Sequence, residues 1–349
     1  MNFPHKDFEK ASCKDANIDK GLLVDMFDKI DEEKINIHSM ILIKDGNKVF
    51  DAYASGYGPD FKEEVYSISK SFTSLAIGIC QDMGLLNIHD KIIQYFEGHF
   101  KKIKPYYDTM TIQNLLTMTV GHPQDYLYSL KPNEDPINAF FQGDITDAPG
   151  TKFMYNTLAS FILSVIVTKV TGKTVNDFLD ETLYQPLQID KPLWHTIGAY
   201  SAGGYGLELS ILDLAKFGHL LLNDGNWRGQ QIVSKAYIRE ATSFQISTAH
   251  VDNPADRYGY GYQFWINEFG DFRAAGLFKQ YIVINREFNV VFCTQAYEER
   301  ELLNLYKSYV LTGLHSGWTF DNFTLRNYIR RFGENSLEVI KNEKLNRKM

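Results

Sequence analysis

Ser67 and Lys70 form the short pattern in this sequence that is best suited to covalent chemistry. They stand in the tetrapeptide Ser67-Ile68-Ser69-Lys70, at the start of a predicted helix over residues 67–83. Side chains three residues apart lie on the same face of a helix, so the two would be neighbours. A serine hydroxyl is a weak nucleophile that needs a base, and a partly desolvated lysine can serve as that base. The free N–H groups of the helix N-terminus would also favour a developing oxyanion. The alternative is a serine and a lysine on a solvated helix face with no catalytic role, because four-residue patterns also match by chance.

The elements that must position this pair are predicted from hydrophobic spacing and turn residues. Helices are expected over residues 20–34, 67–83, 111–119, 157–171, 174–183, 210–223 and 299–314. Strands are expected over residues 38–44, 48–54, 258–267, 272–276, 280–285 and 289–296. A two-stranded hairpin is marginally stable alone, so we expect the early hairpin to pair with the late strands.

The predicted fold class is therefore α+β, with an antiparallel sheet flanked by helices and an inserted, mostly helical lobe. We expect a single unit over residues 1–349 in which the sheet lobe covers about 1–65 plus 240–315. The helical lobe would cover about 66–239, and residues 316–349 would form a C-terminal extension, including Trp318, Phe320 and Phe323.

Composition excludes several classes of protein. The 349 residues are 44% hydrophobic and 23% charged, which is typical of a globular chain and not of a disordered or collagen-like one. A net charge of −7 without a basic block disfavours binding to nucleic acid or to an anionic membrane. The three cysteines show no C-x-x-C spacing, so we expect buried thiols at Cys80 and Cys293 rather than a disulfide framework. No apolar segment occurs in Met1–Lys20 and no stretch is long enough for a membrane span, so we expect a cytoplasmic protein.

The sequence gives less support to metal-dependent, α/β-hydrolase or nucleotide-binding chemistry. The nine histidines show no zinc-binding spacing, and neither a G-x-S-x-G elbow nor a phosphate-binding P-loop occurs, so we expect no metal and no organic cofactor. The segment Gly203-Gly204-Tyr205-Gly206 lacks a preceding strand, so it is interpreted as a tight turn under a cleft. His122 is interpreted as structural. The aromatic residues between Tyr258 and Trp265 are interpreted mainly as strand residues in the core.

Four segments, in order, are similar to those of the serine β-lactamase-like hydrolases, and most to the branch of class C β-lactamases, esterases and penicillin-binding proteins. The segments are Val65–Thr73, Thr111–His122, Pro149–Thr157 and Ala202–Gly218, and the resemblance extends over about residues 35–315. It implies the β-lactamase/DD-peptidase-like fold. Each segment alone is a weak signal, and their order and spacing make the resemblance specific.

The resemblance also implies roles for individual residues. Ser67 would be the acylated nucleophile, Lys70 its proton partner, and Tyr155 a second base that takes or returns the proton at the leaving group. Tyr155 could act as a base only if a cation such as Lys70 stabilised its phenolate. Thr157 stands where the family often has asparagine, and its hydroxyl could orient the lysine or a substrate carbonyl.

The third family motif, K-T-G or H-x-G, corresponds to Ala274-Ala275-Gly276, so Ala274 replaces its cation. That replacement removes a charge-assisted hydrogen bond to a substrate carboxylate, which is worth roughly 1.5–3 kcal/mol. Gly276 would still let the strand lie close to the substrate, and the N–H groups of Leu277 and Ser67 would form the oxyanion hole. Lys279 could supply a substitute charge.

We therefore predict a serine hydrolase that forms a Ser67 acyl-enzyme on a small-molecule ester or amide. The first alternative is a penicillin-binding D-amino-acid peptidase or a β-lactamase, which the loss of the cation at Ala274 disfavours. The second alternative is a non-catalytic binding or sensor protein with the same fold, which the presence of Ser67, Lys70 and Tyr155 disfavours. The sequence gives no indication of the oligomeric state.

Overall fold

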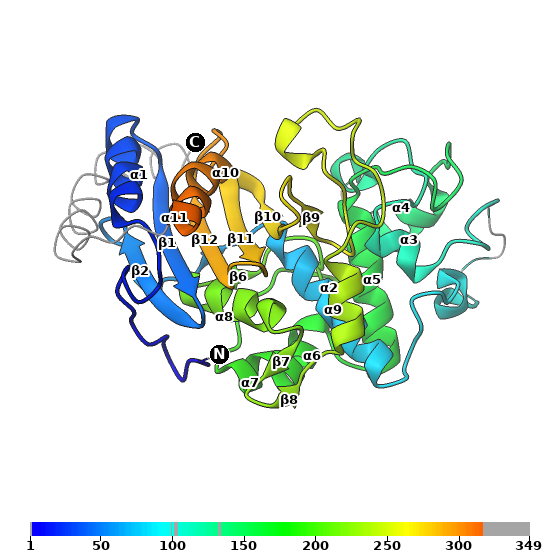
Figure 1. The fold of residues 1–349 in the computed structure, drawn as a ribbon. Helices are drawn as coiled ribbons and strands as arrows, with labels where there is room; N and C mark the ends of the chain where they lie inside the picture. Colours follow the sequence, from blue (N-terminus) through cyan, green and yellow to red (C-terminus); the bar gives the residue numbers. More distant parts are fainter. Residues whose placement is uncertain (1, 99, 101–103, 132–133, 317–349) are drawn as a thin grey trace. The chain divides into compact units, whose positions relative to one another are not determined.

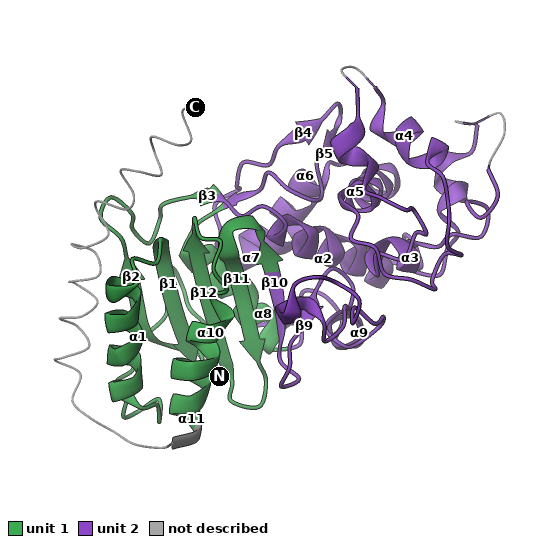
Figure 2. Ribbon diagram, turned by 90° about the horizontal axis from the view of Figure 1, so that it is seen from above, with its two compact units in different colours: residues 1–63, 209–223, 275–349 green, residues 64–208, 224–274 purple. Residues whose placement is uncertain are grey.

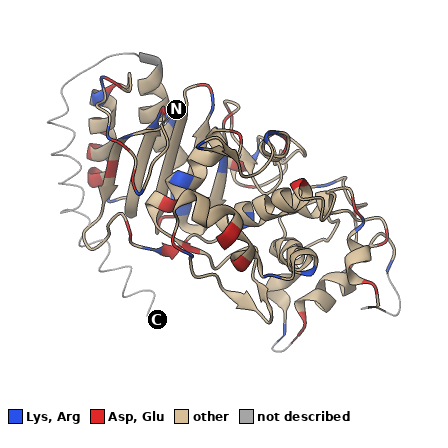
Figure 3. Ribbon diagram, turned by 90° about the horizontal axis from the view of Figure 1, so that it is seen from below, with Lys and Arg blue, Asp and Glu red and all other residues tan. Residues whose placement is uncertain are grey.

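A computed structural model describes residues 2–98, 100, 104–131 and 134–316, and the chain within it divides into two compact units. Unit 1 comprises residues 1–63, 209–223 and 275–349, and unit 2 comprises residues 64–208 and 224–274 (Figure 2). Along the ribbon, Lys and Arg residues are interspersed with Asp and Glu residues (Figure 3). The expected C-terminal extension lies outside the described residues from residue 317 onward.

Unit 1 is built on an antiparallel sheet in the order β2-β1-β12-β11 (Figure 1). The early hairpin pairs with a late strand as expected, with Met40 opposite Thr294. Asp45 and Gly46 both have positive φ, which suits the tight turn between β1 and β2. The strands are β1 Ile37–Lys44, β2 Asn47–Tyr53, β11 Gln280–Asn285 and β12 Val290–Ala296.

Helices cover both faces of this sheet (Figure 2). Helix α8, Ile211–Leu222, packs on β11 and β12, where a side chain at Gly218 would collide with Val291. The other face carries α1 Lys20–Glu32, α10 Leu303–Leu305, a π-helical turn Tyr306–Leu311 and α11 Thr312–Ser316. The closing helix expected over residues 299–314 is thus present but irregular.

Unit 2 is mainly helical and has α2, Ile68–Asp82, at its centre, in contact with α5, α6 and α9. We expected an amphipathic helix, but residues Ile68–Cys80 are buried on all sides. Polar side chains of α2 are accommodated by hydrogen bonds, such as those from Ser71 to the Gln263 carbonyl and from Thr73 to the Gly203 carbonyl. The remaining helices are α3 Ile112–Leu116, α4 Pro136–Gln142, α5 Thr157–Thr171, α6 Val175–Leu179, α7 Gln185–Leu187 and α9 Lys235–Ala241.

Short hairpins and turns complete unit 2. The paired strands are β4 Thr196–Ile197 with β5 Tyr200–Ser201, and β7 Asn226–Trp227 with β8 Gln230–Gln231. Helical turns of 3-10 type lie at Ile92–Phe96, Tyr126–Ser129 and Pro254–Asp256. The chain passes between the units at β3 Glu63–Glu64, at β6 Glu208–Leu209, after α8 between residues 223 and 224, and at β10 Phe272–Gly276.

Two expectations need correction. The strand predicted over residues 258–267 is reduced to β9, Trp265–Ile266, because Gly259 and Gln263 take positive φ and Gly261 packs against the Ala241 carbonyl. The lobe boundaries also differ, since α8 belongs to unit 1 and residues 240–274 belong to unit 2.

Two further observations concern the described residues. No single helix there is long and apolar enough to span a membrane, although α5 and Val175–Leu187, bent by 65°, meet the length and composition criteria as a pair. Cys13, Cys80 and Cys293 are all buried free thiols, so the expectation for Cys80 and Cys293 is confirmed.

Candidate active site

Ser67 and Lys70 lie side by side at the N-terminus of α2. Lys70 Nζ donates hydrogen bonds to Ser67 Oγ and to the Gly204 carbonyl, each at 2.9 Å. Lys70 is 1% exposed, and this burial lowers the pKa of its amine to about 7, although the carboxylate of Asp125 acts in the opposite direction. A lysine that titrates near neutral pH is partly unprotonated there and can accept the proton of Ser67 Oγ.

The backbone immediately before Ser67 is strained. Tyr66 has a φ of 47°, in the left-handed region that bulky residues rarely adopt. Its carbonyl accepts a hydrogen bond from Ser69 Oγ at 2.6 Å, and Ser69 Oγ accepts one from the Leu207 N–H at 3.3 Å. These bonds hold the unusual conformation in place, and strain of this kind is concentrated at functional sites.

Tyr155 lies against the same pair. The Lys70 Nζ atom is 4.8 Å from the centroid of the Tyr155 ring, and the ring of Trp265 stacks on Tyr155 with centroids 5.8 Å apart and an angle of 14° between planes. Burial raises the pKa of the Tyr155 phenol well above its usual value, while a hydrogen bond with Ser67 acts in the opposite direction. Tyr155 therefore holds its proton in the resting site, and Lys70 is the better base of the two.

A buried polar chain fixes the segment that carries Tyr155. The Asn156 side chain caps α5 by accepting a hydrogen bond from the Ala159 N–H, and its Nδ2 donates to His122 Nδ1 at 3.1 Å. His122 Nε2 is 2.8 Å from the Tyr107 hydroxyl. Burial lowers the pKa of His122 to about 4, so the ring is neutral at physiological pH. This arrangement agrees with the structural role predicted for His122.

Asp125 is a member of the site that sequence reasoning missed. Its carboxylate accepts hydrogen bonds from the N–H groups of Thr157, at 2.5 Å, and Leu158, at 3.3 Å, so it binds the N-terminus of α5. The same carboxylate influences the pKa values of Lys70 and Tyr155. Asp125 stands three residues after His122, but nothing local in the sequence marks it as a partner of a helix 32 residues away.

The two glycines of the Gly203-Gly204 turn allow the backbone to lie directly against Lys70. Gly203 has a φ of 72°, and a Cβ atom on Gly204 would lie 2.6 Å from Thr157 Cγ2 and 3.4 Å from Lys70 Nζ. Thr157 thus lies beside Lys70, but its hydroxyl makes no hydrogen bond to that lysine in the part of the chain that the structure describes. The interpretation of this segment as a tight turn fits these observations, and the orienting role suggested for Thr157 stays a prediction.

Residues of the third motif are divided between the units. Ala274, fully buried, belongs to unit 2, whereas Gly276 and Leu277 belong to unit 1, so the oxyanion role of the Leu277 N–H stays a prediction. Lys279 Nζ pairs with Glu301 at 3.3 Å. The ammonium charge of Lys279, which could have replaced the missing cation, is thus paired with a carboxylate.

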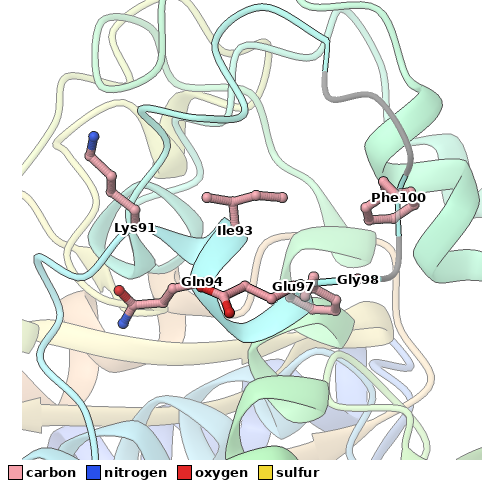
Figure 4. Close-up of a pocket in the computed structure, with 7 residues that line it drawn as sticks. Lys91, Ile93, Gln94, Glu97, Gly98 and Phe100 are labelled. Atoms are coloured by element: carbon pink, nitrogen blue, oxygen red, sulfur yellow. The ribbon is translucent and has the colours of Figure 1, made fainter.

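A surface hollow of about 380 Å³ lies elsewhere in unit 2, around the turn Ile92–Phe96 (Figure 4). Its lining residues are Lys91, Ile93, Gln94, Phe96, Glu97, Gly98 and Phe100. The lining includes none of Ser67, Lys70 and Tyr155. This hollow is therefore separate from the candidate active site. Within the described residues, no group of three or more His, Cys, Asp or Glu side chains is placed to hold a metal ion.

Comparison with known proteins concerns the family and the fold of the chain. The model of the family described as Beta-lactamase matches residues 26–294. Protein flp from Staphylococcus aureus (strain MW2) is 29% identical over 167 residues, which cover 43% of this chain and 33% of that protein. Penicillin-binding protein 4* from Bacillus subtilis (strain 168) is 26% identical over 174 residues, which cover 44% of this chain and 37% of that protein. The matches thus span about a third of the length of these curated relatives.

Solved structures show the same fold at low sequence identity. The octameric penicillin-binding protein homologue from Pyrococcus abyssi superposes with a TM-score of 0.68 and 22% identity, covering 84% of this chain and 77% of that one. The penicillin binding protein from Bacillus halodurans superposes with a TM-score of 0.64 and 15% identity, covering 82% of this chain and 98% of that one. These similarities confirm the predicted α+β fold of β-lactamases and penicillin-binding proteins.

Proposed function

The chain belongs to the β-lactamase family, and from this membership we propose that it is a serine hydrolase that forms a covalent acyl-enzyme at Ser67 on a small ester or amide. The observation that supports the proposal most directly is the 2.9 Å hydrogen bond between Lys70 Nζ and Ser67 Oγ. It joins a nucleophile to a buried lysine whose pKa is about 7. A pair of this kind is poised for acyl transfer at neutral pH.

In the proposed acylation step, Ser67 Oγ attacks the substrate carbonyl carbon and its proton passes to the unprotonated amine of Lys70. The carbonyl oxygen becomes an oxyanion, for which the N–H groups of Ser67 and Leu277 are the predicted donors. When the bond to the leaving group breaks, Tyr155 donates its proton to the departing oxygen or nitrogen, and Lys70 returns a proton to Tyr155. Water then attacks the acyl-enzyme carbonyl while Lys70 takes a proton from that water. When the bond between the acyl carbon and Ser67 Oγ breaks, Lys70 returns the proton to Ser67 Oγ and the acid is released.

We propose an ester or amide substrate in preference to a β-lactam or a D-amino-acid peptide. Ala274 offers a buried methyl group where penicillin-recognising members of the family have a cation, and Lys279 is paired with Glu301. A substrate carboxylate would therefore lack the charge-assisted hydrogen bond expected there.

The test uses a fluorophosphonate probe and a panel of substrates on the wild type and Ser67→Ala. The panel contains p-nitrophenyl esters, p-nitroanilides, nitrocefin and a D-Ala-D-Ala peptide. We expect labelling and ester hydrolysis that both vanish in Ser67→Ala. Absence of labelling between pH 6 and 9 would instead favour a non-catalytic binding or sensor protein. Stable acylation by fluorescent penicillin, without ester turnover, would favour a penicillin-binding peptidase.

A further inference from the structure

Trp265, in β9, lies against the Tyr155 ring and is itself packed by further rings. It stacks on Tyr155 with ring centroids 5.8 Å apart and an angle of 14° between planes, so the two rings are close to parallel. Phe153 and Tyr260, both buried, meet Trp265 edge-on, with centroids 5.6 Å and 4.7 Å away. The buried core therefore holds Trp265 in place, and Trp265 covers part of the Tyr155 ring.

A stacked partner matters for Tyr155 because its backbone is fixed while its phenol can still turn. The Met154 N–H donates to the Met118 carbonyl at 2.9 Å, and the Asn156 N–H donates to Met118 Sδ at 3.2 Å. The backbone on both sides of Tyr155 is therefore held. The direction of the hydroxyl, however, depends on the side-chain torsions of the tyrosine. Groups that pack on the ring therefore decide whether the hydroxyl reaches Ser67, with which it makes a hydrogen bond.

Arg273 supports Trp265 from the neighbouring strand. The two residues are direct partners in the antiparallel pairing of β9 with β10, and the Arg273 guanidinium lies 5.7 Å from the centroid of the Trp265 ring. Arg273 is 1% exposed, and its guanidinium donates hydrogen bonds to the side-chain oxygens of Asn267 and Asp256. A guanidinium held in this way stabilises an aromatic ring beside it. A chain of contacts therefore runs from Arg273 through Trp265 to Tyr155.

Trp265 differs in its surroundings from other aromatic residues of its segment. Tyr260, Tyr262 and Phe264 are each at most 1% exposed, as expected of core residues. Trp265 is half-buried, and its ring lies beside both a catalytic ring and a buried cation. Apolar packing alone would favour a hydrophobic residue in place of Arg273, because a buried guanidinium is costly to desolvate. The presence of this cation beside Trp265 indicates that the position of the tryptophan ring matters for more than the core.

We propose that Trp265, supported by Arg273, is a positioning residue that orients the Tyr155 ring so that its hydroxyl stays directed at Ser67 and the leaving group. This inference rests on the proposed function of Ser67, in which Tyr155 gives its proton to the departing atom as the bond to that atom breaks. A displaced phenol slows this proton transfer and leaves the attack by Ser67 intact. The effect of Trp265 therefore depends on the leaving group.

The test measures Trp265→Leu and Trp265→Phe on a p-nitrophenyl ester and on two substrates of the same acid with poorer leaving groups, the ethyl ester and the p-nitroanilide. Trp265→Leu should lower kcat for the two poorer substrates by about 10- to 100-fold and change their KM by less than about threefold, because small displacements of a reacting group cost rates of this order. Hydrolysis of the p-nitrophenyl ester and fluorophosphonate labelling should change by less than about threefold, since neither needs the Tyr155 proton. Trp265→Phe keeps a flat ring and should restore kcat to within about threefold of the wild type.

Two controls separate positioning from a general loss of structure. Phe264→Leu removes a buried ring from the preceding residue, which packs on Phe272, and should leave the ratio of the rates for good and poor leaving groups unchanged. In a Tyr155→Phe background, Trp265→Leu should lower the rates for the poorer substrates by less than about twofold, because no phenol hydroxyl remains to be positioned. If circular dichroism shows that Trp265→Leu does not fold, Trp265→Met carries the same comparison, since it also removes the flat ring and keeps more of the side-chain volume.

The outcomes distinguish this inference from the proposed function. Equal losses for all three substrates in Trp265→Leu, or a Trp265→Phe variant as slow as Trp265→Leu, would overturn the positioning role and leave the proposed function standing. A wild type that neither hydrolyses these substrates nor reacts with the fluorophosphonate would overturn the proposed function, and this inference with it.

Discussion

The titration of Lys70 gives a sharp test of the proposed mechanism. Burial lowers its pKa from 10.5 to about 7, a shift equivalent to about 5 kcal/mol against the protonated amine. With a pKa of about 7, about half of the molecules hold the unprotonated base at pH 7. With an ordinary pKa of 10.5, only about one molecule in 3,000 would do so.

The pH profile of kcat/KM should therefore rise about tenfold between pH 5 and 6, bend near pH 7 and level off by about pH 8. The assay uses an uncharged p-nitrophenyl ester, followed at the isosbestic wavelength of nitrophenol so that ionisation of the product does not distort the profile. The rate of fluorophosphonate labelling should follow the same curve, because labelling requires only the attack by Ser67.

Asp125→Asn supplies the perturbation. The Asp125 carboxylate raises the pKa of Lys70, so removal of its charge should move the bend to lower pH. The asparagine oxygen can still accept a hydrogen bond from the Thr157 N–H, which preserves part of the cap on α5. Lys70→Arg should lose activity at every pH, because a guanidinium does not act as a base in this range. A profile that continues to climb tenfold per pH unit through pH 9, or an Asp125→Asn bend at higher pH, would refute the assignment of Lys70 as the base.

Three further predictions concern the surroundings of this pair. Tyr155→Phe should lower kcat/KM for p-nitroanilides by about 10²- to 10⁴-fold, but for p-nitrophenyl esters by less than about tenfold. The anilide is the poorer leaving group, so only its departure needs the proton of Tyr155. Equal losses for the two substrates in steady-state assays would contradict the donor role. Gly204→Ala should lower kcat/KM by about 10- to 100-fold without loss of the circular dichroism spectrum, because its Cβ would displace Thr157 or Lys70. His122 should contribute up to about 3 kcal/mol to the fall in the free energy of unfolding between pH 6.5 and 4, because it is held neutral in the fold with a pKa of about 4 and gains a proton when the chain unfolds. His219, whose pKa burial also lowers to about 4, adds a separate contribution that the His122 variant keeps. Urea unfolding of His122→Gln should show a shallower loss, and an equal pH dependence in both proteins would count against this last prediction.

The sequence predicted those parts of the fold that local patterns determine. The helix expected over residues 157–171 is observed at Thr157–Thr171, where Asn156 caps its start and Gly172, with a φ of 72°, ends it. The pairing of β1 with β12 followed from the need of a hairpin for partners. The strand expected over residues 258–267 was wrong because alternation of aromatic residues does not show where glycine turns the chain into a packed loop.

Predictions about the tertiary placement of elements were weaker, because placement depends on residues that are far apart in the sequence. Hydrophobic spacing identified α8 as a helix, but its place in unit 1 depends on contacts with β11 and β12, which lie more than 50 residues later in the chain. Ser67 and Lys70 were placed together correctly because three-residue spacing in a helix is a local rule. Asp125 was missed because its partners are backbone N–H groups of a distant helix.

Burial of Lys70 and Tyr155 in one site has opposite effects on their two pKa values, and this difference underlies the roles proposed for them. It lowers the pKa of the amine and raises that of the phenol, so both groups can be neutral near pH 7. In the molecules whose Lys70 is unprotonated, the proposed mechanism creates charge in this pair only when Ser67 attacks, as the proton reaches Lys70 and the oxyanion forms. Asp125 favours the new ammonium at that moment, since its carboxylate already stabilises the protonated lysine. The site is therefore more complementary to the charges of the transition state than to those of the resting state, and this difference is what lowers a reaction barrier.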